Sequence, residues 1–308
     1  MKRFLIHLIL CFIVLVVICM IPCRIYEKKA KECTDMEPYS RINLVDNLKN
    51  FNADVVVLGN SRAECGYNVS ILDSLTGKKW LNLGISGYPF DMQCNVMYKR
   101  YLEQNSKPQF IILETSPITS FRRSQRTYNI EMLPYVGRDG FKAYVDMCPE
   151  ITVADKWMFV RYFGKLDLVV KELQKLEKPR KQTESIKKDW DGENDTIMGK
   201  EIEEFRFNAA IIKSFCGFLE ECLEQDVKVI LVCSPIYGDR VRGYYDMDDF
   251  WRRIKYAVSG KKVPILIYQD IYGYDESYFN DPIHLNEYGG EQFSIQLAHD
   301  LDSLGLLR

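Results

Sequence analysis

Short apolar runs alternate along this chain with segments whose apolar residues have helical spacing. Five runs predict strands, at residues 54–58, 80–83, 110–114, 227–233 and 264–268. Runs that are apolar at nearly every position are typical of strands covered on both faces, as in a parallel sheet. Helical spacing is found between and after them, at about residues 69–75, 91–104, 200–225, 247–258 and 286–303. The alternation predicts an α/β fold, with a five-stranded parallel sheet between two layers of helices.

The alternation is interrupted between about residues 118 and 205. Aromatic helical patterns at about 139–147 and 153–175 are followed by a highly charged stretch from Lys171 to Asp195. Such a stretch has too few large apolar side chains to bury much surface, so we expect a mobile loop there. The segment is predicted to be a helical and charged insertion within one domain.

The N-terminus carries the longest apolar stretch. Lys2 and Arg3 precede Phe4–Ile21, which is apolar apart from His7. At about 1.5 Å per residue this length crosses most of the ~30 Å hydrocarbon layer of a membrane. The residues that follow contain no small-residue cleavage pattern, so an uncleaved transmembrane signal anchor is favoured over a cleaved signal peptide.

The predicted organisation therefore has three parts. Residues 1–23 form the anchor, 24–50 a charged juxtamembrane stalk ending in a short helix near 42–48, and 51–308 the α/β domain. Basic residues flank the anchor on both sides, so the positive-inside rule does not decide the orientation. A short N-terminal anchor before a large soluble domain most often places that domain outside the cytoplasm, and we expect the same here.

Composition excludes some functions. The chain has 308 residues, with 41 basic and 43 acidic side chains and a net charge of -2, which gives no indication of a nucleic-acid partner. No glycine-rich dinucleotide or P-loop motif follows the first strand. The ten cysteines contain no C-x-x-C pair, so neither a zinc site nor a dense disulfide framework is indicated. No cofactor or metal is expected.

Candidate chemistry lies where the strands end. Ser61 comes just after the first strand in Gly59-Asn60-Ser61, and chemistry in open α/β sheets is placed at that edge. Asp281-Pro282-Ile283-His284 precedes the last helix and can fold back over the same edge. Asp281 would then hold the His284 imidazole, which would take a proton from Ser61 as in a Ser–His–Asp triad. Backbone N–H groups of Ser61 and Gly84 would form part of an oxyanion hole.

These motifs resemble those of the SGNH/GDSL hydrolases, a flavodoxin-like α/β family of serine esterases and acyl-handling enzymes. Gly59-Asn60-Ser61 matches the nucleophile block, Gly84 the glycine that gives an oxyanion N–H, and Asp281-Pro282-Ile283-His284 the C-terminal Asp-x-x-His block. The resemblance covers about residues 52 to 308. It implies a three-layer α/β/α fold with Ser61 as nucleophile, His284 as base and Asp281 as its orienting partner.

The sequence departs from the family in the loop that follows the third predicted strand. An asparagine whose side chain completes the oxyanion hole is expected there, but the chain has Glu114-Thr115-Ser116. Thr115 or Ser116 would have to donate instead, or the hole has only two donors. Together with the anchor, this variation resembles a divergent membrane-anchored branch that handles D-alanyl or O-acetyl groups on cell-envelope polymers.

The expected function is that of a membrane-anchored serine esterase or acyltransferase acting on ester-linked acyl groups, with acylated envelope glycans as expected substrates. The alternative is a catalytically weak or inactive SGNH-like domain that binds an envelope glycan or a protein. Ser61 could also be only the N-cap of the next helix, and Arg62 a solvated or ion-paired arginine or a ligand for an anion. Hydrolysis and transfer share the acyl-enzyme step, and the residues do not separate them.

Overall fold

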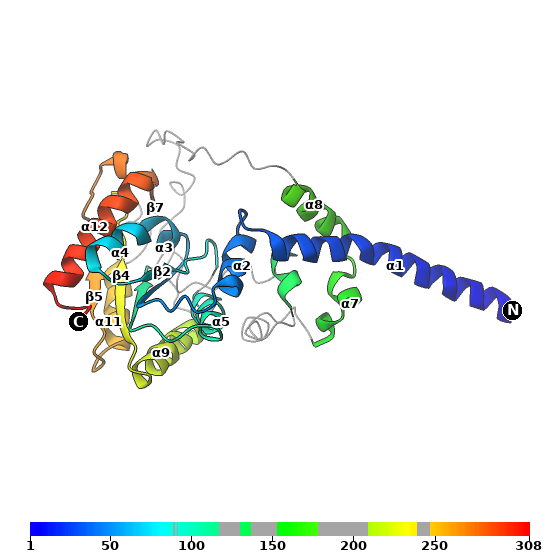
Figure 1. Ribbon diagram of the computed structural model, residues 1–308, viewed down its shortest axis with the longest axis horizontal. Coiled ribbons are helices and arrows are strands. Elements are labelled where there is room, and N and C mark those ends of the chain that lie inside the picture. The colour runs from blue at the N-terminus through cyan, green and yellow to red at the C-terminus, as the bar shows by residue number, and fades with distance from the viewer. Residues whose placement is uncertain (89, 91, 117–129, 137–152, 178–208, 239–246) are drawn as a thin grey trace. The chain divides into compact units, whose positions relative to one another are not determined.

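The computed structural model describes residues 1–88, 90, 92–116, 130–136, 153–177, 209–238 and 247–308 (Figure 1). The chain divides into two compact units. The first comprises Met1–Leu44 and Arg126–Gln182, and the second comprises Val45–Gln125 and Thr183–Arg308.

The second unit is built on a five-stranded parallel sheet. Its strands are β1 (Val55–Leu58), β2 (Trp80–Asn82), β3 (Phe110–Glu114), β4 (Lys228–Cys233) and β5 (Ile265–Ile267). They lie in the order β2-β1-β3-β4-β5, and every neighbouring pair is parallel. This is the flavodoxin-like order, in which ligands bind beyond the carboxyl ends of the strands. The predicted α/β fold with five parallel strands is confirmed.

Helices cover both faces of this sheet. Figure 1 shows α3 (Ser61–Gly66), α4 (Val69–Thr76) and α12 (Glu287–Ser303) on one side, and α5 (Lys99–Leu102) and α9 (Ala209–Glu224) on the other. Alternate strand residues such as Val55 and Val57 pack with Leu72 of α4 and Phe293 of α12 in one buried cluster. The unit also contains the π-helical turn η1 (Met92–Tyr98) and α11 (Met247–Ala257).

A small antiparallel hairpin precedes α12. The 3-10 turn η4 (Glu276–Tyr278) leads into β6 (Phe279–Asp281), which pairs with β7 (His284–Leu285). Asp281 and His284 are directly paired across this hairpin.

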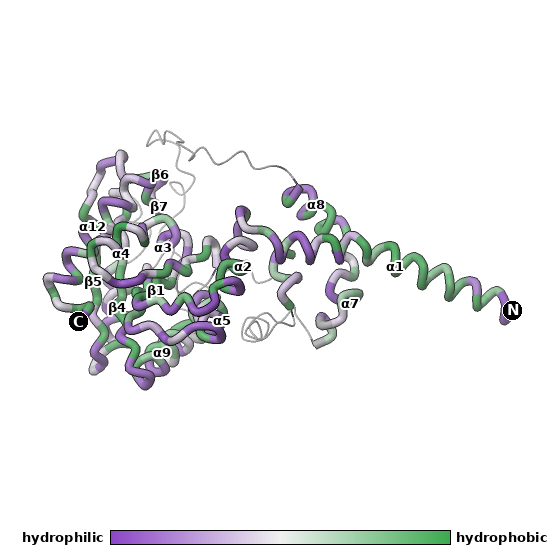
Figure 2. Tube along the Cα trace, in the orientation of Figure 1, coloured by the Kyte–Doolittle hydropathy of each residue, from purple (hydrophilic) through white to green (hydrophobic). Residues whose placement is uncertain are grey.

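The first unit is organised around α1 (Lys2–Glu32), which continues well past the predicted end of the anchor at residue 23. Figure 2 shows α1 as apolar over most of its N-terminal length, and length and composition fit both a membrane span and a signal sequence. Its C-terminal part packs with η2 (Ile130–Tyr135), α7 (Met158–Tyr162) and α8 (Leu166–Glu177), and η3 (Val153–Lys156) packs with α7. α2 (Tyr39–Asn47) then leads into the second unit.

The prediction of one continuous helix at 153–175 is wrong. It is divided into η3, α7 and α8, and Gly164 adopts a left-handed conformation with φ of 71° between the last two. That backbone conformation ends a right-handed helix. The predicted mobile loop from Lys171 begins too early, because Lys171–Glu177 belong to α8. The helix predicted at 139–147 lies outside the described residues, and the predicted domain boundaries stay a prediction.

Candidate active site

Ser61 is the first residue of α3, immediately after the turn that follows β1. The cap of α3 is Asn60, whose side-chain oxygen accepts the Arg62 N–H at 2.9 Å. The interpretation of Ser61 as the N-cap is therefore wrong by one residue. Because Asn60 performs the capping, the Ser61 hydroxyl is available for another partner.

Gly59 is needed because the chain passes very close to its neighbours at this turn. A Cβ atom at residue 59 would lie 2.5 Å from the Cβ of Ala63 and 2.6 Å from the Cβ of Glu114. Both are well inside van der Waals contact, so only glycine lets α3 start directly against the ends of β1 and β3.

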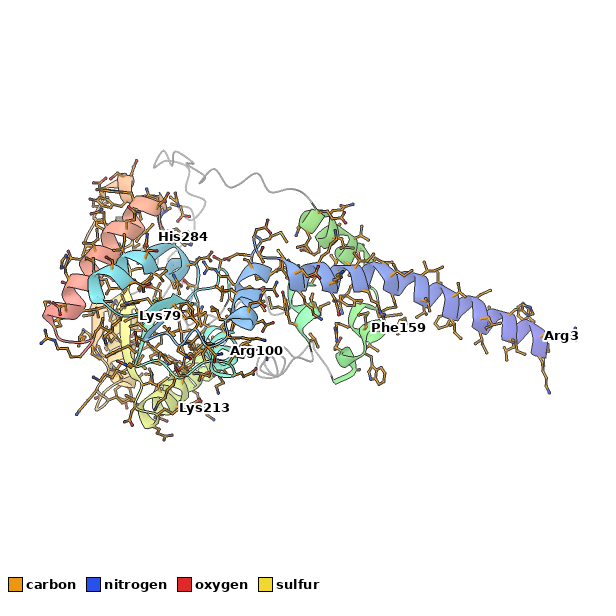
Figure 3. The ribbon with its side chains drawn as sticks, in the orientation of Figure 1. Arg3, Lys79, Arg100, Phe159, Lys213 and His284 are labelled. Carbon is orange, nitrogen blue, oxygen red and sulfur yellow. The ribbon has the colours of Figure 1, made fainter. Side chains whose placement is uncertain are left out.

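The structure brings the three predicted site residues together. His284 Nε2 lies 2.7 Å from Ser61 Oγ, and His284 Nδ1 lies 2.7 Å from Asp281 Oδ2. The imidazole, which Figure 3 labels, therefore bridges a hydroxyl and a carboxylate that are far apart in the sequence. The catalytic roles assigned to these residues remain a proposal.

The hairpin fixes the Asp281 carboxylate as well as the ring. Its second oxygen, Oδ1, accepts the backbone N–H groups of Ile283 and His284, each at 2.9 Å. Burial opposes ionisation of Asp281, but the hydrogen bond and charge attraction to His284 and these two N–H groups outweigh it. The pKa of Asp281 is consequently lowered from its usual value of 3.8. A carboxylate that stays ionised favours the tautomer in which Nδ1 carries the proton and leaves Nε2 as the acceptor.

Two glycines in the first turn of α12 hold the hairpin against the serine helix. A Cβ at Gly289 would lie 2.0 Å from the backbone oxygen of Tyr278, and one at Gly290 would lie 2.6 Å from that of Cys65 in α3. Asn286 caps α12 through the N–H of Gly289 at 2.8 Å. Sequence reasoning missed these residues, although the Gly289-Gly290 pair early in a predicted helix was a visible signal of close packing.

The predicted oxyanion donors differ in their availability. Among the described residues the Ser61 N–H has no hydrogen-bond partner. The Gly84 N–H already donates to the Asn82 side chain at 2.9 Å. The Thr115 hydroxyl donates to the Leu113 carbonyl at 2.9 Å, and its N–H donates to Val232 at 2.7 Å. The assignment of Thr115 as an oxyanion donor is therefore not supported, since both of its donors are committed within a buried residue.

Gly84 is also required for steric reasons. A Cβ there would lie 2.7 Å from the backbone nitrogen of Glu64 in α3. Asn82, which holds the Gly84 N–H, also donates to the Ala63 carbonyl at 2.8 Å. The end of β2 is thus fastened to the helix that carries Ser61.

Arg62 is neither solvated nor open to a ligand. Its Nε donates to Glu114 Oε1 at 3.1 Å, and Nη2 donates to the Ser234 hydroxyl at 2.8 Å. Tyr67 donates to the other Glu114 oxygen at 2.7 Å, and all four side chains are buried. Glu114 begins the loop in which an asparagine was expected from the resemblance, and here it forms a buried ion pair with Arg62, the residue after Ser61.

No metal cluster is formed by the histidine, cysteine, aspartate and glutamate side chains of the described residues. The cysteines described in the structure are free thiols.

No protein-family model and no curated protein matches this chain. Solved structures that resemble it include a Bacteroides fragilis protein assigned as an acylhydrolase, at 12% identity and TM-score 0.42, covering 88% of this chain and 98% of that one. An acetyl xylan esterase from Butyrivibrio proteoclasticus has 10% identity and TM-score 0.40, covering 84% and 66%. A Desulfitobacterium hafniense protein assigned to the G-D-S-L lipolytic family has 10% identity and TM-score 0.37, covering 80% and 97%.

The descriptions of these neighbours name an acylhydrolase, a G-D-S-L lipolytic protein and carbohydrate esterases. Their TM-scores are below 0.5, so we base the functional proposal on the geometry of Ser61, His284 and Asp281.

Proposed function

We propose that the protein is a serine ester hydrolase or acyltransferase that works through an acyl-enzyme. The observation that supports this most directly is the continuous chain of 2.7 Å contacts from Ser61 through His284 to Asp281. A hydroxyl within hydrogen-bond reach of an imidazole that a carboxylate holds in place is the arrangement that activates a serine.

In the proposed reaction the Ser61 oxygen attacks the ester carbonyl while its proton moves to His284 Nε2. Asp281 stabilises the imidazolium that results. His284 then gives the proton to the departing alcohol, which leaves an acyl group on Ser61. Water or a sugar hydroxyl, deprotonated by His284, attacks this acyl group, and His284 returns the proton to the Ser61 oxygen as it leaves.

The carbonyl oxygen becomes negative during attack and needs donors. The Ser61 N–H belongs to the attacking residue itself and has no hydrogen-bond partner among the described residues. A single donor of this kind raises kcat by a factor of about 10²–10³ in other hydrolases. The commitment of Gly84 and Thr115 to other acceptors favours the second candidate, a catalytically weak or inactive domain that binds a glycan or protein.

Hydrolysis of p-nitrophenyl acetate by the full chain separates the two candidates. Turnover that disappears in Ser61→Ala and persists in Ser70→Ala, the same change at an exposed serine of α4, supports the enzyme. If the wild type and both variants release p-nitrophenol equally slowly, the binding domain is the better account.

We propose further that α1 anchors the protein in a membrane, with the α/β unit outside the cytoplasm. The exposed apolar side chains from Phe4 to Ile21 support this placement. Ester-linked acyl groups on envelope glycans are then the substrates within reach. Digestion of intact cells and of inverted vesicles with protease tests the orientation: the α/β unit should be cleaved in the cells and protected in the vesicles.

A further inference from the structure

A second apolar surface lies in the first unit, on α7 and the residues beside it. Trp157, just before α7, is 74% exposed, and Phe163, just after it, is 71% exposed. Phe159 and Val160 within α7 are 39% and 40% exposed. The Phe159 and Phe163 rings are in contact at 5.6 Å between centroids, so these four side chains, the α7 patch, are more than scattered single residues.

The α7 patch is fixed to α1 by buried polar contacts. Arg161 Nη1 donates to Glu27 Oε1 at 2.5 Å, and the Tyr162 hydroxyl donates to the same oxygen at 3.1 Å. The Tyr26 and Tyr162 rings meet edge to face at 6.1 Å. Arg161 and Glu27 are both buried, and such a pair holds α7 beside one turn of α1 (Figure 1; Phe159 of α7 is labelled in Figure 3).

The position of that turn along α1 can be compared with the thickness of a bilayer. The exposed apolar stretch Phe4–Ile21 rises about 27 Å along the helix, close to the ~30 Å of the hydrocarbon core. Glu27 lies about 9 Å further along the axis. The headgroup layer on each side is about 5–8 Å thick, so α7 is attached at the outer edge of this layer.

We propose that the α7 patch lies in the interface of the bilayer that α1 spans, so that the protein has two membrane contacts. This rests on the proposed anchoring by α1. Aromatic side chains are enriched at that depth, and an apolar surface there loses water contact without needing a protein partner. Arg24 and Lys28, exposed on the same part of α1, are suitably placed for lipid phosphates.

Fluorescence quenching by brominated lipids tests this contact in the full chain. The protein is reconstituted into nanodiscs whose phosphatidylcholine carries bromine near the headgroup or deep in the acyl chain. We expect the shallow bromines to quench part of the emission, and this part to be lost in Trp157→Phe. The matched control Trp251→Phe should retain it, because Trp251 is buried in the second unit.

Alkaline extraction of the same membranes separates failure of the inference from failure of the anchor. If the protein is released, α1 is no anchor, and both the proposed anchoring and the interfacial contact of the α7 patch are overturned, whereas the proposed esterase chemistry is unaffected. If it is retained but quenching is the same in the wild type and Trp157→Phe, the anchor stands and the interfacial contact is overturned. Trp157 that is unquenched by lipid and also protected from acrylamide would show that protein and not lipid covers it, which likewise overturns the inference.

Discussion

Replacement of Gly290 by alanine should loosen the active site from a distance. The added Cβ would lie 2.6 Å from the Cys65 carbonyl oxygen, and even the closest carbon–oxygen contacts are usually about 3.3 Å. α12 and α3 must therefore separate by about 0.7 Å or more. Overpacking of this kind costs about 1–3 kcal/mol, against a gain of about 1 kcal/mol from replacing a helical glycine.

The same separation should reach the catalytic contact. Cys65 is in α3 with Ser61, while Gly290 is in the helix that follows His284, so the strain acts across the 2.7 Å contact between Ser61 and His284. Misplacement by about 1 Å can cost a factor of 10² in rate. We expect a net loss of up to about 2 kcal/mol in urea unfolding and a clearly lower kcat for p-nitrophenyl acetate.

Gly217→Ala is the matched control. Gly217 is exposed on α9, and no heavy atom lies within 4 Å of a Cβ placed there. This variant should keep full activity and gain up to about 1 kcal/mol from helix propensity. If Gly290→Ala and Gly217→Ala behave alike in stability and rate, the packing of α12 on α3 does not position His284 and the reasoning is refuted.

Four further predictions concern residues around Ser61. Glu114→Ala leaves the buried Arg62 guanidinium without its carboxylate partner and should cost about 3–5 kcal/mol in urea unfolding. Arg62→Met combined with Glu114→Leu should cost much less than the two single changes added; a fully additive pair would contradict this. Asp281→Asn should lower kcat by about 10⁴ through loss of the right tautomer. Folding lowers the pKa of Asp281, so the stabilisation from its carboxylate should be complete above about pH 4 and lost as the pH falls through the lower pKa of the folded state. The free energies of unfolding of wild type and Asp281→Asn should therefore converge at that acidic pH. A difference in stability that persists there would show that it does not come from the ionised carboxylate. Asn60→Ala removes the cap of α3 and should cost about 1 kcal/mol, whereas Asn60→Asp should stay close to wild type; equal costs would show that the cap is not what matters.

The strands could be predicted because burial on both faces leaves an unbroken apolar signal. β3 matches its predicted range, and β1, β2, β4 and β5 differ by one or two residues at their ends. The proximity of Ser61 and His284 was predictable from motif order and from the rule that such chemistry lies at the carboxyl edge of the sheet.

What could not be predicted depends on contacts between elements far apart in the sequence. The N–H of Gly84 is taken by Asn82, and the donors of Thr115 point into the sheet, because of how these side chains pack after folding. Arg62 was expected to be solvated, ion-paired or bound to an anion, and the ion-paired alternative is confirmed. Its partner and its burial could not be predicted, because Glu114 comes next to Arg62 only through the pairing of β1 and β3. The break at Gly164 follows from a backbone conformation that glycine permits but does not require.

Labelling with a fluorophosphonate, followed by mass mapping of the modified peptide, tests the central claim most directly. The account predicts one stoichiometric adduct on Ser61, absent in Ser61→Ala and formed much more slowly in His284→Ala. Modification that is equal in the wild type and both variants, or that maps to another residue, would contradict an activated serine at this site.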